Sequence, residues 1–137
     1  MRADIADRRL YLLTDFAVCC AVVTIDTSKE AQYETVAWTT DEPALIVHRL
    51  CVAPSAQGKG FGQQLMSFVE DYARQHDHAS LRLDAYSGNP RALALYQRRG
   101  YREAGQVFFP RQVLPFKCFE LSLDRRQTSS KFKSSRA

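Results

Sequence analysis

The first third of the chain contains short apolar runs and stretches in which apolar and polar residues alternate. These stretches are too short for typical helices and are rich in β-branched and aromatic side chains, which favours strands. Asp15 lies at the expected hairpin turn after the first stretch, and Pro43 ends a polar break before the last. The predicted strands are residues 10–13, 16–25, 33–39 and 44–52.

From Phe61 the spacing of apolar residues changes to that of a helix. Positions 61, 65, 68, 69 and 72 are apolar, so they lie on one face of a helix predicted over residues 61–76. Alternation then returns and predicts a strand over residues 81–86. Because a helix joins the strands at 44–52 and 81–86, these two strands should be parallel.

A second, shorter helix is predicted over residues 92–99. Asn89 is a suitable N-cap, Pro90 suits the first helical position, and Gly100 stands where a helix commonly ends. The remaining predicted strands are residues 101–109 and 116–123. The pattern therefore predicts an α+β fold, with a mixed, mostly antiparallel sheet flanked by helices.

The hexapeptide Gln-Gly-Lys-Gly-Phe-Gly at residues 57–62 separates a predicted strand from a predicted helix. Glycines let backbone N–H groups converge, and the helix N-terminus adds positive partial charge at the same point, so the loop suits phosphate groups. A nucleoside-triphosphate loop fits poorly, because no Ser or Thr follows Lys59. A dinucleotide fingerprint also fits poorly, because Gln63 occupies the place of its third glycine.

A third pattern, Q/R-x-x-G-x-G/A, matches at Gln57, Gly60 and Gly62. In this the loop resembles the coenzyme A pyrophosphate loop of the GNAT N-acetyltransferase superfamily. Residues 89–101 resemble a later motif of that family, N-x-x-A-x-x-x-Y-x-x-x-G-F/Y. The resemblance extends over residues 10–123 and is greatest with small bacterial members.

The resemblance implies an N-acetyltransferase that uses acetyl-CoA as its cofactor. The acetyl group would pass by direct attack to a primary amine of a small molecule or protein. The pantetheine arm would lie along the strand near Leu50 and Val52, where strands that splay apart leave backbone donors for the acyl carbonyl. The implied cofactor-binding residues are Leu50, Cys51, Val52, Gln57, Gly58, Lys59, Gly60, Phe61, Gly62, Asn89, Ala92 and Tyr96.

Tyr96 is the predicted general acid. A departing thiolate has a pKa of about 8.5 and a phenol one of about 10, so proton donation would be nearly balanced. The alternative is that Tyr96, on the predicted short helix, only packs in the protein core.

The base is left open among several residues. An alkylammonium group has a pKa of about 10.4, and removing its proton at pH 7 costs about 4 to 5 kcal/mol without assistance. In the family that the chain resembles, acetyltransferases of ribosomal-protein termini place a base at the position that matches Asp84, but Asp84 could instead pair with Arg82 or Arg49. His48 could instead be a satisfied sheet histidine, and water relays would make a single base unnecessary. The candidates are Asp84, His48, Glu42 and Glu34.

The positive net charge is concentrated at one end. The chain has a net charge of +4, but residues 125–137 contain five basic and no acidic side chains. Without them, 14 basic residues face 15 acidic ones. We therefore expect a domain at residues 1–124 and a disordered basic tail, with only weak support for nucleic-acid binding.

Location and metal content follow from features that the chain lacks. No pair of its cysteines (Cys19, Cys20, Cys51 and Cys118) has C-x-x-C spacing, which favours free buried thiols in a reducing compartment and no metal. Residues 1–9 are charged, and no apolar run approaches the length of about 20 residues that spans a bilayer. We expect a cytoplasmic protein without a membrane partner.

The start of the chain departs from the family pattern. Family members usually place a strand and one or two helices before the hairpin that begins here near Leu10. We therefore expect a shortened acyl-CoA N-acyltransferase (GNAT) fold lacking the usual first strand and N-terminal helices. An exposed sheet face would make a homodimer possible. The alternative function is a coenzyme A-binding protein without catalytic activity.

Overall fold

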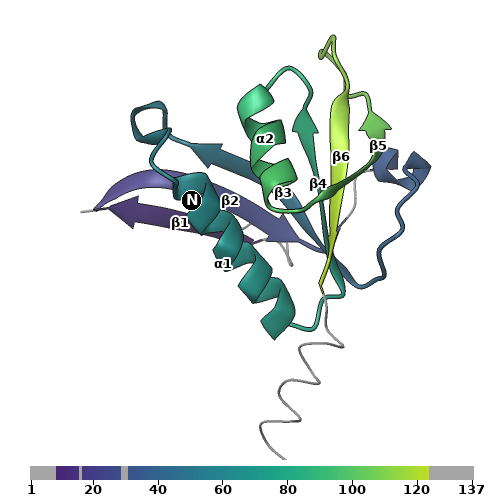
Figure 1. Ribbon diagram of the computed structural model, residues 1–137, viewed down its shortest axis with the longest axis horizontal. Coiled ribbons are helices and arrows are strands. Elements are labelled where there is room, and N and C mark those ends of the chain that lie inside the picture. Colours follow the sequence, from purple (N-terminus) through teal and green to yellow (C-terminus); the bar gives the residue numbers. More distant parts are fainter. Residues whose placement is uncertain (1–8, 16, 29–30, 124–137) are drawn as a thin grey trace, which may run out of the picture.

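The computed structural model describes residues 9–15, 17–28 and 31–123. Its six strands form one mixed sheet in the order β1-β2-β3-β4-β6-β5 (Figure 1). Only β3 and β4 are parallel, as predicted for strands joined by a helix. The strands are β1 (Arg9–Asp15), β2 (Val18–Asp26), β3 (Ala44–Val52), β4 (Ser80–Tyr86), β5 (Arg102–Val107) and β6 (Phe116–Ser122).

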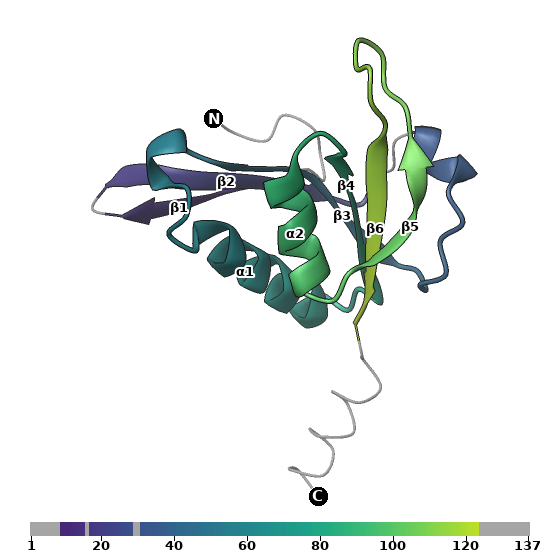
Figure 2. The ribbon, with the colours of Figure 1, turned by 45° about the horizontal axis from the view of Figure 1, so that its top comes forward.

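Two helices, α1 (Phe61–Gln75) and α2 (Pro90–Arg98), lie on the same side of the sheet (Figures 1 and 2). As predicted, the Asn89 side chain caps α2 by accepting a hydrogen bond of 3.2 Å from the backbone N–H of Ala92. Gly100 follows the helix with φ of +89°, a backbone conformation that favours glycine. Two short 3₁₀ helices, η1 (Ala31–Thr35) and η2 (Pro54–Ala56), complete the elements.

The sheet has a core on each face. The larger core lies under the helices, where α1 packs against β2 and β3 and α2 packs against β4. The smaller core lies on the opposite face, and its buried members are Tyr33, Val36, Ala44, Ile46, Val107 and Cys118. Both faces of the central strands are therefore covered, which explains why the first half of β3, residues 44–47, is apolar at every position.

The prediction of a strand at residues 33–39 is wrong. The segment instead forms η1 and an irregular stretch beside β5, on the face without helices (Figure 2). Tyr33 and Val36 are buried in the smaller core, while the indole N–H of Trp38 donates to the Tyr33 carbonyl at 2.9 Å. The apolar residues of this segment thus reflect burial against the sheet, and local hydrogen bonds replace a strand ladder.

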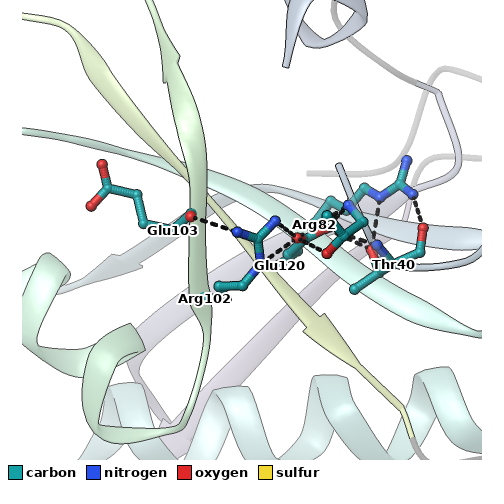
Figure 3. A network of polar contacts seen from close by, with 6 residues as sticks. Thr40, Arg82, Arg102, Glu103 and Glu120 are labelled. Carbon is teal, nitrogen blue, oxygen red and sulfur yellow. Dashed lines mark hydrogen bonds and ion pairs between the residues drawn. The ribbon is translucent and has the colours of Figure 1, made fainter. Parts of the chain in front are cut away.

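A buried carboxylate fixes the end of this segment to the sheet (Figure 3). The Glu120 side chain is 1% exposed and accepts hydrogen bonds from the backbone N–H and hydroxyl groups of Thr39 and Thr40. Arg102 donates to the same carboxylate through Nε, at 2.8 Å, and through Nη2. Burial alone would raise the pKa of Glu120, but these hydrogen bonds outweigh it and lower the pKa to about 2. We call this cluster the Glu120 latch.

Arg82 contacts the same segment and not Asp84. Its Nη2 donates to the Thr40 carbonyl at 2.6 Å, and its guanidinium lies 5.0 Å from the centroid of the Trp38 ring. Arg82 also forms an ion pair with Glu42, with 3.5 Å between the Arg82 Nη1 and the Glu42 Oε2. For Asp84, pairing with Arg82 was one alternative to a base role, and the contacts of Arg82 instead hold residues 38–42 in place.

All four cysteines are free thiols; Cys20 and Cys118 are buried, and Cys19 and Cys51 are exposed. Within residues 9–15, 17–28 and 31–123, no cluster of His, Cys, Asp or Glu has the arrangement of a metal site. No helix in this part of the chain is long and apolar enough to span a membrane. The predicted basic tail, residues 125–137, lies outside the described residues.

Candidate active site

The two parallel strands separate halfway along their length. Their paired residues run from Ala44 and Ser80 to Val47 and Leu83, and no further ladder pair joins the described residues of β3 and β4. Beyond this point the strands diverge, and α2 lies over the opening (Figure 1). We call this opening the split. Backbone groups along its two edges are directed toward the gap, because each edge strand pairs only on its other side.

A β-bulge in β3 lies at the start of the split. Thr24 pairs with Arg49 and Ile25 with Val47, so His48 is the extra residue of the bulge. A bulge redirects the local side chain and strengthens the twist of its strand. His48 and Asp84 thus come directly after the last paired residues and flank the split from its two sides.

A cavity of about 310 Å³ lies on the helix side of the split and contains most of the predicted cofactor residues. Four lining residues had not been predicted: Gln63, Arg91, Leu95 and Arg98. The predicted residues that line it are Leu50, Val52, Gln57, Gly58, Gly60, Phe61, Gly62, Asn89, Ala92 and Tyr96. We call this the first cavity.

The glycine loop is open toward the first cavity. Gly58 and Gly60 have φ of +82° and +83°, and a Cβ at either position would have no atom within 4 Å. The glycines are therefore required by backbone conformation and not by packing within the protein. The first helical bond of α1 joins the N–H of Gln64 to the Gly60 carbonyl at 3.0 Å, so the earlier N–H groups of the helix have no intrahelical acceptor.

Other residues of the loop have different positions. The Gln57 side chain donates to the Val52 carbonyl at 3.3 Å and closes the loop onto the end of β3. Gly62 lies inside α1, where a Cβ would be 3.5 Å from Leu95, an ordinary contact distance. Lys59, a predicted cofactor residue, lines neither this cavity nor the second one described below.

Two cations border the first cavity. Arg91 and Arg98 both come from α2 and lie with Leu95 at positions i, i+4 and i+7, which form one helix face. That periodicity is visible in the sequence and was the available signal for these residues. Guanidinium groups beside open backbone N–H groups form a site suited to phosphates.

A second cavity, of about 190 Å³, lies at the split itself. Leu50, Asn89, Ala92 and Tyr96 line both cavities, so the two meet there. Cys51, another predicted cofactor-binding residue, lines only the second of the two cavities. The titratable residues that line this second cavity are His48, Arg49, Cys51, Asp84, Tyr86 and Tyr96.

Tyr96 lies where the two cavities meet and is 4% exposed. Burial raises the pKa of its phenol, and the nearby Asp84 and Cys51 raise it further. The phenol therefore remains protonated at neutral pH and can act as a proton donor. Its proton transfer to a thiolate is less balanced than that of an exposed phenol, which corrects the expectation from ordinary pKa values.

His48 and Asp84, the two base candidates in the second cavity, each have a buried partner. The His48 Nε2 lies 2.5 Å from the Asp26 Oδ1, with these side chains 10% and 1% exposed. The hydroxyl of Tyr33 donates to the Asp84 Oδ2 at 2.6 Å. Sequence reasoning missed these partners, because Asp26 lies 22 residues before His48 and Tyr33 lies 51 residues before Asp84.

The other two base candidates lie elsewhere. Glu42 is half-exposed and paired with Arg82, and Glu34 is exposed on η1. Neither lines the first or second cavity. The structure thus brings together His48, Asp84 and Tyr96 from the predicted catalytic set.

The sequence of this chain is also similar to those of known proteins. A sequence profile of the Acetyltransferase (GNAT) family matches residues 17–101, which include β3, the glycine loop, both helices and β4. The chain is also 31% identical over 75 residues to streptothricin acetyltransferase from Streptomyces lavendulae. This match spans 55% of the chain but only 40% of that enzyme's length.

Solved structures share the fold. The spermidine/spermine N-acetyltransferase of Vibrio cholerae superposes with a TM-score of 0.69 at 19% identity, covering 93% of this chain and 74% of the other. A Salmonella typhimurium protein whose structure contains acetyl-CoA superposes with a TM-score of 0.66 at 18% identity, covering 85% and 65%. The six-stranded sheet with its two helices therefore matches that of known acetyltransferase structures.

Proposed function

The chain belongs to the acetyltransferase (GNAT) family, and we propose that it transfers the acetyl group of acetyl-CoA to a primary amine. The observation that carries the proposal is the junction of the two cavities at the split. One cavity presents open backbone amides and arginines, the other presents a histidine and a carboxylate, and Tyr96 lies between them.

The first cavity suits the cofactor. The diphosphate would accept hydrogen bonds from backbone N–H groups of residues 58–63, with Arg91 and Arg98 balancing its charge. The pantetheine arm would follow the free edge of β3 past Val52 and Leu50 toward the split. The thioester would then lie beside Tyr96, within reach of backbone donors that can stabilise charge on its carbonyl oxygen.

The second cavity suits the amine and the proton transfers. His48 or Asp84 would take a proton from the ammonium group, and the amine nitrogen would then attack the acetyl carbonyl carbon. As the carbon–sulfur bond breaks, the sulfur keeps the bonding electrons and the Tyr96 phenol donates its proton to it. The nitrogen then passes its second proton to the Tyr96 phenolate. The products would be an amide and free coenzyme A.

The acceptor is expected to be a cation. Asp26 and Asp84 contribute carboxylates at or beside the second cavity, and the rings of Tyr86 and Phe116, 5.2 Å apart, form part of its wall. Streptothricin, spermidine and spermine, which the names of similar proteins specify, are therefore the first acceptors to test. A cytoplasmic location, a homodimer and a separate basic tail remain predictions from the sequence.

Two measurements on the full chain test this function. Calorimetry should detect saturable binding of coenzyme A and acetyl-CoA. Release of free thiol from acetyl-CoA should accelerate when streptothricin, spermidine, spermine or a peptide with a free N-terminus is added, relative to acetyl-CoA alone. Cofactor binding without acceleration by any amine would favour the alternative, a coenzyme A-binding protein without catalysis. Absence of binding by folded protein would contradict both.

A further inference from the structure

The two buried pairs at the second cavity have opposite chemical character. A carboxylate can only accept hydrogen bonds, so the contact with Asp26 places a proton on the His48 Nε2. In the neutral ring the lone pair is then on Nδ1. Asp84, in contrast, receives a proton donor, the hydroxyl of Tyr33. The pair of Asp26 and His48 therefore orients a neutral base, and the pair of Tyr33 and Asp84 stabilises a negative charge.

The environment of each pair strengthens this difference. A carboxylate beside an imidazole stabilises the imidazolium that forms when the ring takes up a second proton. A hydrogen bond donated to a carboxylate stabilises its charged form and makes it a poorer proton acceptor. Tyr33 is 1% exposed and its backbone is fixed by Trp38, so the donor to Asp84 cannot easily turn away.

Resting on the proposed acetyl transfer, we propose that Asp26 is a positioning residue that makes His48 the proton acceptor, while Asp84 attracts the ammonium group. The ammonium nitrogen loses one proton to the His48 Nδ1, and the imidazolium keeps its Nε2–H hydrogen bond to Asp26. The freed lone pair on nitrogen forms the new bond to the acetyl carbon. The electrons of the carbon–sulfur bond leave with sulfur, which takes the Tyr96 proton. The nitrogen then releases its second proton to the Tyr96 phenolate, which forms the neutral amide and restores the phenol. The imidazolium later loses its extra proton to solvent.

Asp26 also has a structural contact that the test must separate. Its carboxylate accepts hydrogen bonds of 3.0 Å from the backbone N–H and from the hydroxyl of Ser28, which close the turn after β2. Asp26→Asn retains a side-chain oxygen for that turn and removes the charge. Ser28→Ala is the matched control, because it removes a turn hydrogen bond and leaves the pair of Asp26 and His48 intact.

The first arm of the experiment needs no catalysis. The chain contains three histidines, so ring ¹⁵N resonances of ¹⁵N-histidine-labelled protein can be assigned by comparison with His48→Gln. We expect His48 in the Nε2–H form in the wild type and in Ser28→Ala. In Asp26→Asn the amide can donate to Nε2, so a population with Nδ1–H should appear. A wild-type ring in the Nδ1–H form, or no change in Asp26→Asn, would overturn the proposal.

The second arm measures turnover with whichever amine the thiol assay identifies. Asp26→Asn should lower kcat about 100-fold with little change in the KM for acetyl-CoA, as expected for losing an oriented base. Ser28→Ala should remain within about threefold of the wild type, because a single exposed turn contact contributes little. Asp84→Asn should instead raise the KM for the amine.

Rescue gives a signature that a structural role would not produce. Added imidazole should restore activity to His48→Ala but not to the double variant with Asp26→Asn, because the added ring needs the carboxylate to orient it. Equal rescue of both variants, or equal losses in Asp26→Asn and Ser28→Ala, would overturn the role of Asp26. No turnover with any amine would refute the proposed function and the proton-acceptor role with it, whereas the histidine resonances would still decide the pairing.

Discussion

The two cavities that meet at the split are built in different ways. The first cavity is lined mainly by two continuous stretches, residues 57–63 and 89–98, with the end of β3 beside them. The second draws its chemistry from β2, β3, β4, α2 and η1, and its key contacts join residues far apart in the chain. Local backbone geometry is therefore enough to shape the cofactor side, whereas the acceptor side depends on the packing of the whole sheet.

This difference has a functional consequence. A diphosphate is recognised by backbone N–H groups and helix ends, which short glycine-containing segments provide by themselves. An amine acceptor must be deprotonated and oriented, which requires side chains held by partners. We therefore expect the cofactor side to tolerate changes on the opposite face of the sheet, and the acceptor side to be sensitive to them.

The largest expected effect concerns the glycine loop. Gly60→Val places a branched side chain in the first cavity, so calorimetry should show affinity for coenzyme A reduced about 100-fold or more. Gly100→Val is the matched control, since Gly100 also has positive φ and open space around its Cα, but lies past α2 outside the cavity. Similar losses in both variants would mean that backbone strain, and not the cavity, controls binding.

The residue shared by both cavities offers the next test. Tyr96→Phe should lower kcat about 100-fold, within the range for loss of a general acid, while cofactor affinity stays nearly unchanged. Tyr101→Phe is a suitable control, because Tyr101 is also buried but lies outside both cavities. Its hydroxyl, just before β5, donates to the Glu70 carboxylate on α1 at 2.9 Å. It should lower unfolding free energy by about 1 to 3 kcal/mol and leave kcat nearly unchanged. An unchanged kcat in Tyr96→Phe would exclude the acid role.

Changes in the Glu120 latch should have the smallest effect on coenzyme A binding, and their main effect should be on the stability of the fold. The folded-state pKa of Glu120, about 2, lies below the ordinary value of 4.5. As the pH falls, Glu120 is therefore protonated in the unfolded chain before it is protonated in the folded protein. Its ionised form stabilises the fold fully above about pH 5, and this stabilisation is lost as the pH falls toward 2. Urea unfolding at several pH values should show Glu120→Gln less stable than the wild type at pH 7, with the gap closing toward pH 3.

The same variant sharpens the comparison of the two faces. Because the latch holds the segment that carries Tyr33, Glu120→Gln should raise the KM for the amine a few-fold at pH 7 and leave coenzyme A affinity unchanged. A gap in stability that is equal at pH 3 and pH 7 would contradict the charge-based account. A large loss of coenzyme A affinity would contradict the independence of the two cavities.

Sequence patterns predicted the elements wherever local rules governed them. All six described strands, both helices, the Asn89 cap and the parallel pairing of β3 and β4 follow from periodicity, capping and chain connection. The strand predicted at residues 33–39 failed because apolar residues in such a segment report burial, and a segment that lies across a sheet face buries Tyr33 and Val36 without strand pairing. Residues 33–39 also could not pair with the preceding strand, because both edges of β2 are already paired, with β1 and β3.

The candidate site divides along the same line. The sequence by itself determined the cofactor loop, because positive φ at Gly58 and Gly60 and the helix start after them are properties of adjacent residues. It also placed Tyr96, through its fixed distance from the cap of α2. Only the tertiary structure decided the partners of His48, Asp84 and Glu120, because Asp26, Tyr33 and Thr40 lie 22, 51 and 80 residues away from them and meet them only when the sheet forms. Hydrogen bonds act over a few ångströms in space, and nothing in the order of residues specifies those distances before folding.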